Sequence, residues 1–220
     1  MIISIDGPAG SGKSTVASLL AEKLGFIHFN SGSLFRAITA YLLENNFNFA
    51  IIEESYPKLE LQLDIKIINN SQHIFVNNID YTSQLRNNNV SIHAPLISIN
   101  KYIRNIIDKK QKQFAKSNNV VIDGRDIGSH VFPKAEFKFY LDCNIKERAK
   151  RRFNEEKLKN SKITLKQIKN ELSERDFFDK TRKIAPLVIP KNAIVVDSTK
   201  LTIDEVIDKM LNHIKETIRN

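Results

Sequence analysis

Cysteine is almost absent from this sequence, because Cys143 is the only one among 220 residues. A disulfide within the chain is therefore excluded, and no cluster of cysteine and histidine is present that could hold a structural metal ion. Cys143 ends an apolar run at 137–143, so we expect a buried thiol in a reducing compartment. The five histidines are scattered along the chain, and we expect structural or surface positions for them.

Long apolar runs are also missing. None approaches the ~20 residues that a membrane helix needs, and the N-terminus carries neither a basic segment nor a cleavable apolar one. We therefore expect a cytoplasmic protein without a membrane partner, and we expect a monomer. Hydrophobic residues still make up 41% of the chain. That is enough for the core of one α/β domain over residues 1–220 with small insertions.

Acidic residues are in the minority. The 34 Lys and Arg residues against 25 Asp and Glu residues give a net charge of +9. The excess could mark a surface for nucleic acid, or it could reflect arginines gathered around small anionic substrates. No stretch interleaves aromatic and basic residues as a stacking platform for nucleic acid does. We therefore favour small anionic substrates and keep a nucleotide-dependent nucleic-acid-binding protein as the alternative.

The most informative stretch is residues 2–24. It opens with a short apolar run at 2–5, which predicts a buried strand. Apolar residues at helical spacing then predict a helix from about residue 15 to Gly25, a helix stop. Between them, GPAGSGKS at 7–14 matches G-x-x-x-x-G-K-[ST] at every fixed position. Strand, glycine-rich loop and helix follow in the order of a P-loop.

The residue types of this loop suit a polyphosphate. Gly7, Gly10 and Gly12 let the backbone curl with its N–H groups inward, and the following helix N-terminus favours an anion. The ammonium of Lys13 can reach the β- and γ-phosphates, and the hydroxyl of Ser14 can face Mg²⁺. We therefore expect a site for a nucleoside triphosphate. Its predicted residues are Gly7, Pro8, Ala9, Gly10, Ser11, Gly12, Lys13, Ser14 and Thr15.

Further apolar runs complete an α/β pattern. The expected strands are 2–5, 26–29, 120–122, 137–141 and 193–196. The last three are followed by Asp123, Asp142 and Asp197. Strands that end in this way suit an open parallel sheet of five strands flanked by helices, whose ligands bind outside the carboxyl ends.

Residues 61–85 interrupt this pattern. The segments 63–67 and 73–76 alternate between apolar and polar side chains, and a turn at 69–71 separates them. We therefore expect a small antiparallel β insertion. It could be decoration without a role, or it could take part in binding.

Helices are expected at 31–45, within the acidic part of 46–60, at 89–116 and at 202–218. Ser31 or Ser33 could cap the first of them. Pro95 marks a kink or a restart in the third. Thr202 and Glu205 have the spacing of a capping box at the start of the last.

Two groups of charged residues lie in the stretch 145–182, each on one helix face. They are Arg148, Arg151 and Arg152, and then Arg175, Asp179 and Arg182. Guanidinium groups supply positive charge to a transferring phosphoryl group without a change of protonation. The lysine-rich segment 153–170 between the groups predicts a mobile lid that excludes water.

With these motifs in place, the whole chain resembles the bacterial cytidylate kinases, which are nucleoside monophosphate kinases. The motifs are ISIDGPAGSGKST at 3–15, NSGSLFR at 30–36, VVIDGRDIGSHVFP at 120–133, ERAKRR at 147–152, ERDFFDKTRKIAPL at 174–187 and DSTKLTIDEV at 197–206. The resemblance implies transfer of a phosphoryl group from ATP to CMP or dCMP, with Mg²⁺. It implies a single P-loop kinase domain with a monophosphate-binding arm at 31–110 and a helical lid at 145–182. A kinase for UMP or AMP stays open as the alternative.

The resemblance also implies a role for each matching residue. The residues that hold the acceptor's α-phosphate in the family match Ser31, Arg36, Arg125 and Arg182. Those that read the cytosine edge match Arg104 and Asp126, and those near the ribose match Arg175 and Asp179. Lys13, Arg148, Arg151, Arg152 and Arg182 resemble the catalytic cations, and Ser14, with Asp123 through water, the ligands of Mg²⁺. A carboxylate such as Asp126 accepts from the cytosine amine and repels the carbonyl of uracil. Pro95 stands where the family has a serine for that amine, and Ser91 or Ser98 could replace it.

Overall fold

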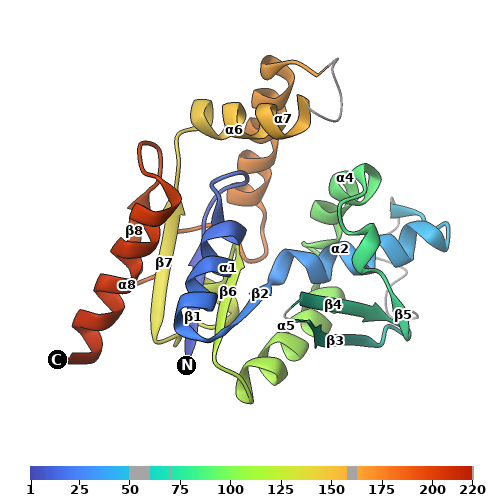
Figure 1. The fold of residues 1–220 in the computed structure, drawn as a ribbon. Coiled ribbons are helices and arrows are strands. Elements are labelled where there is room, and N and C mark those ends of the chain that lie inside the picture. Colours follow the sequence, from blue (N-terminus) through green and yellow to red (C-terminus); the bar gives the residue numbers. More distant parts are fainter. Residues whose placement is uncertain (50–59, 70, 158–162, 220) are drawn as a thin grey trace.

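The computed structural model describes residues 1–49, 60–69, 71–157 and 163–219 (Figure 1). Most of the acidic helix expected within 46–60, the centre of the turn at 69–71 and the middle of the segment 153–170 lie outside the described residues. The elements are β1 (Ile2–Asp6), α1 (Lys13–Leu24), β2 (Ile27–Asn30), α2 (Ser31–Glu44), β3 (Leu63–Ile68), β4 (Ser71–Val76), β5 (Ile79–Asp80), the 3₁₀ turn η3 (Thr82–Gln84), α4 (Asn88–Ile97), α5 (Lys101–Lys116), β6 (Val120–Gly124), the π turn η4 (Ile127–Val131), β7 (Phe137–Asp142), α6 (Ile145–Lys157), α7 (Leu165–Thr181), β8 (Ile194–Asp197) and α8 (Ile203–Arg219). None of the helices in this described part combines the length and apolar character that crossing a membrane requires.

β1 lies in the middle of a five-stranded sheet with the order β2-β6-β1-β7-β8. Each neighbouring pair is parallel, which confirms the predicted sheet. The register places Asp6 of β1 beside Gly124 of β6, and Asn30 of β2 beside Asp123. Because parallel strands end at the same edge, polar side chains from distant parts of the chain meet there.

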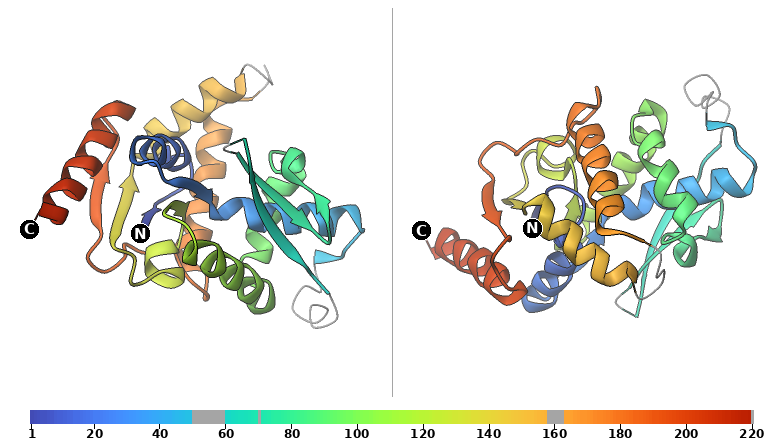
Figure 2. Two further views of the ribbon diagram at one scale, coloured as in Figure 1. Left: turned by 60° about the horizontal axis from the view of Figure 1, so that its bottom comes forward. Right: turned by 90° about the horizontal axis from the view of Figure 1, so that it is seen from above.

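Two groups of helices cover the two faces of this sheet (Figures 1 and 2). On one face, Leu20 of α1 and Met210 of α8 pack with Ile5 in one buried cluster. On the other face, Ile38 of α2 and Ile107 of α5 belong to a second cluster that includes β6. Burial on both faces explains why the strands are short, continuous apolar runs.

β3, β4 and β5 form a separate antiparallel sheet, as predicted for residues 61–85. Ile74 and Val76 of β4 are fully buried, and they share a core with Ile38 of α2. We call α2, this sheet, η3, α4 and α5 the arm; it lies on the right in Figure 1. The insertion is therefore packed into the fold and is not attached only to its surface.

The observed helix caps agree only in part with those predicted from the sequence. Asn30 caps α2, because its Oδ1 accepts a hydrogen bond of 2.8 Å from the backbone N–H of Ser33. The expectation that Ser31 or Ser33 would be the cap was wrong. At α8 the capping box is confirmed: the N–H of Thr202 donates to Glu205, and the N–H of Glu205 donates to the Thr202 hydroxyl.

The helical region expected at 89–116 consists of two helices. Pro95 lies in the last turn of α4 and has no N–H to donate, and the helix ends at Ile97. Asn100 then starts α5, because its side chain accepts a hydrogen bond of 3.0 Å from the N–H of Ile103. Pro95 therefore marks a restart and not a kink.

α6 and α7 form a helix pair beside the loop that follows β1 (Figures 1 and 2). Ala149 of α6 and Ile168 and Leu172 of α7 are buried in one small cluster with Ala9 of that loop. The pair therefore rests on the glycine-rich loop through a few apolar side chains.

Gly7 is the point at which the chain turns out of β1 beside β7. Its φ is +151°, a conformation that only glycine adopts readily, and a Cβ added there would lie 2.2 Å from the carbonyl oxygen of Leu141. Both the backbone angle and the contact with the neighbouring strand therefore require glycine.

We expect Gly7→Ala to lower the free energy of unfolding by about 3 kcal/mol, because it adds a steric clash to backbone strain. Gly25 is a matched control: its φ is +66°, but a Cβ there would meet nothing within 4 Å. Gly25→Ala should cost only about 1 kcal/mol. Urea unfolding followed by circular dichroism measures both losses, and equal losses would contradict the prediction.

Candidate active site

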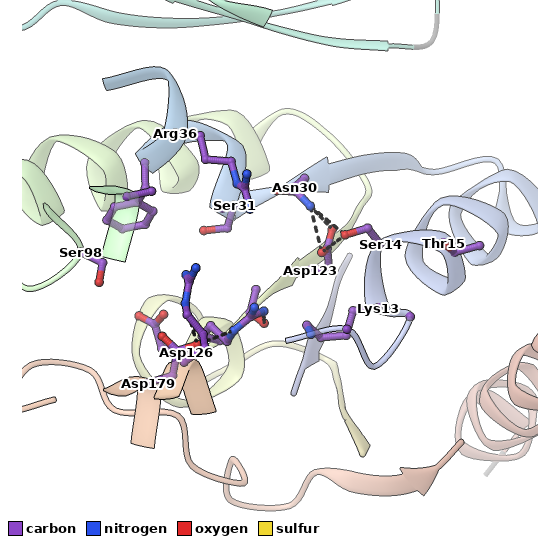
Figure 3. Close-up of a pocket in the computed structure, with 18 of the residues that line it drawn as sticks. Lys13, Ser14, Thr15, Asn30, Ser31, Arg36, Ser98, Asp123, Asp126 and Asp179 are labelled. Carbon is purple, nitrogen blue, oxygen red and sulfur yellow. Dashed lines mark hydrogen bonds and ion pairs between the residues drawn. The ribbon is translucent and has the colours of Figure 1, made fainter. Parts of the chain in front are cut away.

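A cavity of about 350 Å³ lies at the carboxyl edge of the main sheet, where the glycine-rich loop, the arm and the helix pair meet (Figure 3). Its lining residues are Gly10, Gly12, Lys13, Ser14, Thr15, Asn30, Ser31, Gly32, Phe35, Arg36, Ala94, Ser98, Asp123, Gly124, Arg125, Asp126, Arg151, Arg152, Glu155, Arg175, Asp179 and Arg182. Segments that are far apart in the sequence thus share one polar pocket of a size suited to small ligands.

The glycine-rich loop has the backbone shape that the motif predicts. Gly7, Gly10 and Gly12 have φ values of 151°, 74° and 89°, all in the positive region. α1 begins at once at Lys13. The N–H groups of its first turn have no partner inside the helix, so they adjoin the cavity as donors for an anion.

Lys13 is held against this loop. Its ammonium donates to the carbonyl of Pro8 and, at 3.2 Å, to the hydroxyl of Ser11, and the residue is only 4% exposed. Burial and the neighbouring Arg125 lower the pKa of Lys13 well below its usual value. A bound polyphosphate would favour the charged ammonium and so offset both effects.

Ser14 and Asp123 form the oxygen-rich corner of the cavity. The Ser14 hydroxyl donates to Asp123 Oδ2 at 2.7 Å, and His28 Nε2 lies 2.7 Å from Oδ1. The amide of Asn30 donates to the Ser14 hydroxyl at 2.9 Å. Hydroxyl and carboxylate oxygens side by side are ligands that suit Mg²⁺, which binds few protein oxygens and keeps several waters. His28, expected at a structural or surface position, thus contacts the site.

Several guanidinium groups converge on the cavity from different elements. They belong to Arg36 of α2, Arg125 after β6, Arg151 and Arg152 of α6, Arg175 of α7, and Arg182 just after α7. Burial and the nearby Arg125 lower the pKa of Arg36, and burial lowers the pKa of Arg175 to about 10. These shifts record desolvation and crowding of like charge. An anion in the cavity would relieve both.

Asp179 separates two of these arginines. Its Oδ2 accepts a hydrogen bond of 2.9 Å from Arg125 Nε and forms an ion pair of 3.6 Å with Arg175. Although burial works against it, the charges of Arg125, Arg175 and Arg182 lower the pKa of Asp179. The carboxylate therefore stays ionised and fixes the direction of its partners.

Asp126 is the centre of a second buried network. Its Oδ1 accepts from Arg182 at 3.0 Å, and its Oδ2 accepts from both Nη atoms of Arg104 at 3.0 Å. The hydroxyl of Ser98 accepts from Arg182 at 3.1 Å, and the Ser98 carbonyl accepts from Arg104 at 2.7 Å. Oδ1 thus keeps a lone pair for a further donor.

Some predicted site residues do not line the cavity. They are Gly7, Pro8, Ala9 and Ser11, which form the rest of the loop, together with Arg104 and Arg148. Arg104 lies directly behind Asp126 and is 3% exposed. The remaining predicted residues are brought together.

Arg148 points into the protein and not into the cavity. Its guanidinium donates to the carbonyls of Ala9 and Cys143, both at 2.8 Å, and to the Asp176 carboxylate at 2.6 Å. It therefore ties the glycine-rich loop to α7. Cys143 is buried and free, as expected.

Other lining residues were missed or left open from the sequence. The lining residues without a predicted role are Asn30, Gly32, Phe35, Ala94, Gly124 and Glu155. Ser98 lines the cavity, whereas Ser91 and Pro95 do not. The hydroxyl of Ser91 accepts a hydrogen bond from Arg36, and Pro95 lies within α4. The signal that could have singled out Ser98 is its place just after the helix break at Pro95.

Comparisons with known proteins find relatives over nearly the whole chain. The cytidylate kinase family model matches residues 3–216. The cytidylate kinase of Caldicellulosiruptor saccharolyticus is 42% identical over 219 residues, which cover 99% of this chain and 97% of that protein. The chain belongs to the cytidylate kinase family. The cytidylate kinase of Bacillus subtilis is 37% identical over 219 residues, again with 99% and 97% covered.

Solved structures support the fold of this cytidylate kinase family member. An uncharacterized protein from Eubacterium ventriosum superposes with a TM-score of 0.51 at 14% identity, covering 98% of each chain. A protein from Thermus thermophilus gives 0.50 at 15% identity, covering 99% of this chain and 97% of its own. At such low identity the likeness concerns the fold alone.

Asp6, at the end of β1, holds part of the site in place without lining the cavity. It is fully buried, and it accepts hydrogen bonds from the N–H groups of Ile127 at 2.8 Å and Gly128 at 2.7 Å. These bonds hold the segment that carries Arg125 and Asp126 against β1. Burial raises the pKa of Asp6 to about 7, although both hydrogen bonds oppose this.

Asp6 makes stability depend on pH. Its pKa of about 7 in the folded chain exceeds the usual value of 3.8, so the folded chain binds the proton more tightly and ionisation disfavours folding. The free energy of unfolding should fall, relative to that of Asp6→Asn, as pH rises from about 4 to about 7, and level off above. Urea unfolding of both proteins in steps of pH measures the difference. A constant or rising difference would count against the shift.

Replacement by methionine should lower stability much more at Arg148 than at Arg152. Arg148→Met leaves the Asp176 carboxylate buried without its partner, so it should cost about 3–5 kcal/mol of stability. Arg152 pairs with Glu156 near the surface, so Arg152→Met should cost less than about 1 kcal/mol. It should nevertheless lower turnover, because it removes a charge from the cavity. Chemical unfolding and steady-state kinetics separate the two effects; equal loss of stability would refute this division.

Proposed function

We propose that the chain transfers the γ-phosphoryl group of ATP to CMP or dCMP, giving ADP and CDP or dCDP. One observation carries the proposal: a single cavity is lined both by the glycine-rich loop and by a cluster of guanidinium groups, two arrangements that suit phosphates (Figure 3). Lys13 and Ser14 mark one, and the guanidinium cluster that includes Arg36 and Arg182 forms the other. Membership of the cytidylate kinase family supports cytidylate as the acceptor.

The glycine-rich loop binds the triphosphate of ATP. Its curled backbone donates to the phosphates, and Lys13 reaches the β- and γ-phosphates. Ser14 would hold Mg²⁺, with the help of Asp123 through water. When bound, Mg²⁺ offsets the negative charge of the triphosphate oxygens.

The arginine cluster binds the acceptor's phosphate. The residues that we assign to it all line the cavity: Ser31, Arg36, Arg125 and Arg182. Their buried, crowded charges are compensated when a phosphate lies between them. Held in line with the γ-phosphate, the acceptor oxygen needs no strong base, because positioning and charge carry phosphoryl transfer.

Asp126 reads the base of the acceptor. Its Oδ1 accepts from the exocyclic amine of cytosine, while Arg104 and Arg182 hold the carboxylate in place. Ser98, next to Arg182, takes the part of the serine that the family uses at this amine. A carbonyl at this position, as in uracil, faces an oxygen and is rejected. We assign Arg175 and Asp179 to the ribose of the acceptor.

Closure completes the site. We assign residues 31–110 as the acceptor arm and 145–182 as the lid, which excludes water from the transferring group. Arg151 and Arg152 of the lid stabilise the transition-state charge together with Lys13 and Arg182. Arg148 acts as a positioning residue behind the loop. The enzyme works as a cytoplasmic monomer on free nucleotides.

A panel of acceptors tests this function. ADP release is measured with MgATP and each of CMP, dCMP, UMP and AMP in turn. CMP and dCMP should give the highest kcat/KM, and UMP should be lower by about tenfold or more, because its carbonyl faces Asp126. If UMP or AMP were used better than CMP, the assignment of the acceptor would fall. Omission of Mg²⁺ should abolish turnover.

A further inference from the structure

Asn30 connects parts of the molecule that serve different nucleotides. Its Oδ1 caps α2 through the N–H and hydroxyl of Ser33, at 2.8 and 2.9 Å. Its Nδ2 donates to the Ser14 hydroxyl at 2.9 Å and to Asp123 at 3.0 and 3.2 Å. Only this orientation of the amide fits, since a carboxylate requires a donor. One side chain thus links the acceptor arm to the corner where Mg²⁺ would bind.

A residue of the β insertion forms hydrogen bonds with the backbone of Asn30. Gln72 of β4 accepts from the N–H of Asn30 at 2.8 Å, and its Nε2 lies 3.4 Å from the Asn30 carbonyl. The side-chain amide therefore bonds the main chain of β2 as a neighbouring strand would. The N–H and the carbonyl that Gln72 bonds both belong to Asn30, so the contact restrains the rotation of the Asn30 backbone as well as its position.

The packing of the insertion decides which residue reaches Asn30. Gln72, Ile74 and Val76 share one face of β4, because strand side chains alternate. Ile74 and Val76 are fully buried against the arm's core. A shift of register by one residue would expose them and present Ser71 or His73 instead. Burial of the Ile74 and Val76 side chains thus fixes the register of β4 and places Gln72 beside the end of β2.

We propose that Gln72 is a positioning residue through which the β insertion holds Asn30, and with it the start of α2 and the Ser14–Asp123 pair, in register. The inference rests on the proposed function, which assigns the ATP site to the glycine-rich loop and the acceptor site to the arginine cluster. It assigns the insertion a role in aligning the donor corner with the acceptor arm. Gln72 itself touches neither nucleotide and acts only through Asn30.

Gln72→Met is the variant that tests this. Methionine keeps the length and the apolar stem, and it removes both hydrogen bonds. Gln62→Met is the matched control, because Gln62 is an exposed glutamine just before β3 whose amide bonds Asp64. We expect Gln72→Met to raise the dissociation constant of MgADP, measured by calorimetry, by roughly three- to tenfold, the range of one hydrogen bond. We expect kcat for CMP to fall by a similar factor, and Gln62→Met to change neither.

A double-mutant cycle shows whether the effect passes through Asn30. In an Asn30→Ala background, Gln72→Met should weaken MgADP binding by less than about twofold, because the intermediate link is gone. A full effect in that background, or unchanged MgADP binding in Gln72→Met alone, would overturn the proposal. If the parent protein failed to phosphorylate CMP while the MgADP pattern held, the proposed function would fall and this inference would stand.

Hydrogen exchange in the unsubstituted protein provides a check that needs no variant to fold. The Asn30 amide should exchange slowly, because Gln72 accepts from it, and MgADP should slow it further. Rapid exchange of this amide, with or without MgADP, would overturn the proposal as well.

Discussion

Desolvation and mutual repulsion of guanidinium groups that are buried or partly buried form the constraint around which this molecule is arranged. Arg36, Arg125, Arg175 and Arg182 line one cavity, and burial lowers the pKa of Arg36, Arg175 and Arg182. Left to solvent, such side chains would turn outward. Each is anchored instead: Arg36 donates to the carbonyl of Leu85 at 3.0 Å, and the others are paired with Asp126 or Asp179. In the proposed function, phosphate groups would supply the compensation that two carboxylates leave incomplete.

Residues that hold the site and residues that face its ligands are largely separate. Arg148, Asp6 and Gln72 do not line the cavity, yet each fixes a segment that does. All three form hydrogen bonds with backbone groups, and Arg148 also bonds the Asp176 carboxylate, so they set the path of the chain. Groups placed in advance lose less conformational freedom when ligands bind. This arrangement suits a reaction that depends on position and charge and needs little proton transfer.

The sequence predicted local features well and long-range pairings poorly. Apolar runs and the glycine-rich motif were enough for the five parallel strands and for the loop around Lys13, because both signals lie within a few residues. The arginines of the cavity came from the family resemblance and from helical spacing. The inward direction of the Arg148 side chain was missed. Helical spacing shows which residues lie on the same helix face, but it does not show which part of the protein packs against that face. The roles of Asn30 and Gln72 were missed because they lie 42 residues apart and meet only in the fold.

The sizes of the apolar clusters indicate which part can move. The arm and the main sheet share a large core, whereas the buried cluster that joins α6 and α7 to the loop consists of Ala9, Ala149, Ile168 and Leu172. Separation of the helix pair from the loop would break the bond of Arg148 to the Ala9 carbonyl and leave both buried groups without this partner, although the Arg148–Asp176 ion pair between α6 and α7 would remain. Rotation about that contact costs far less, since few apolar side chains repack. In the proposed mechanism, Arg148 is therefore the fixed point about which Arg151 and Arg152 swing toward the phosphates.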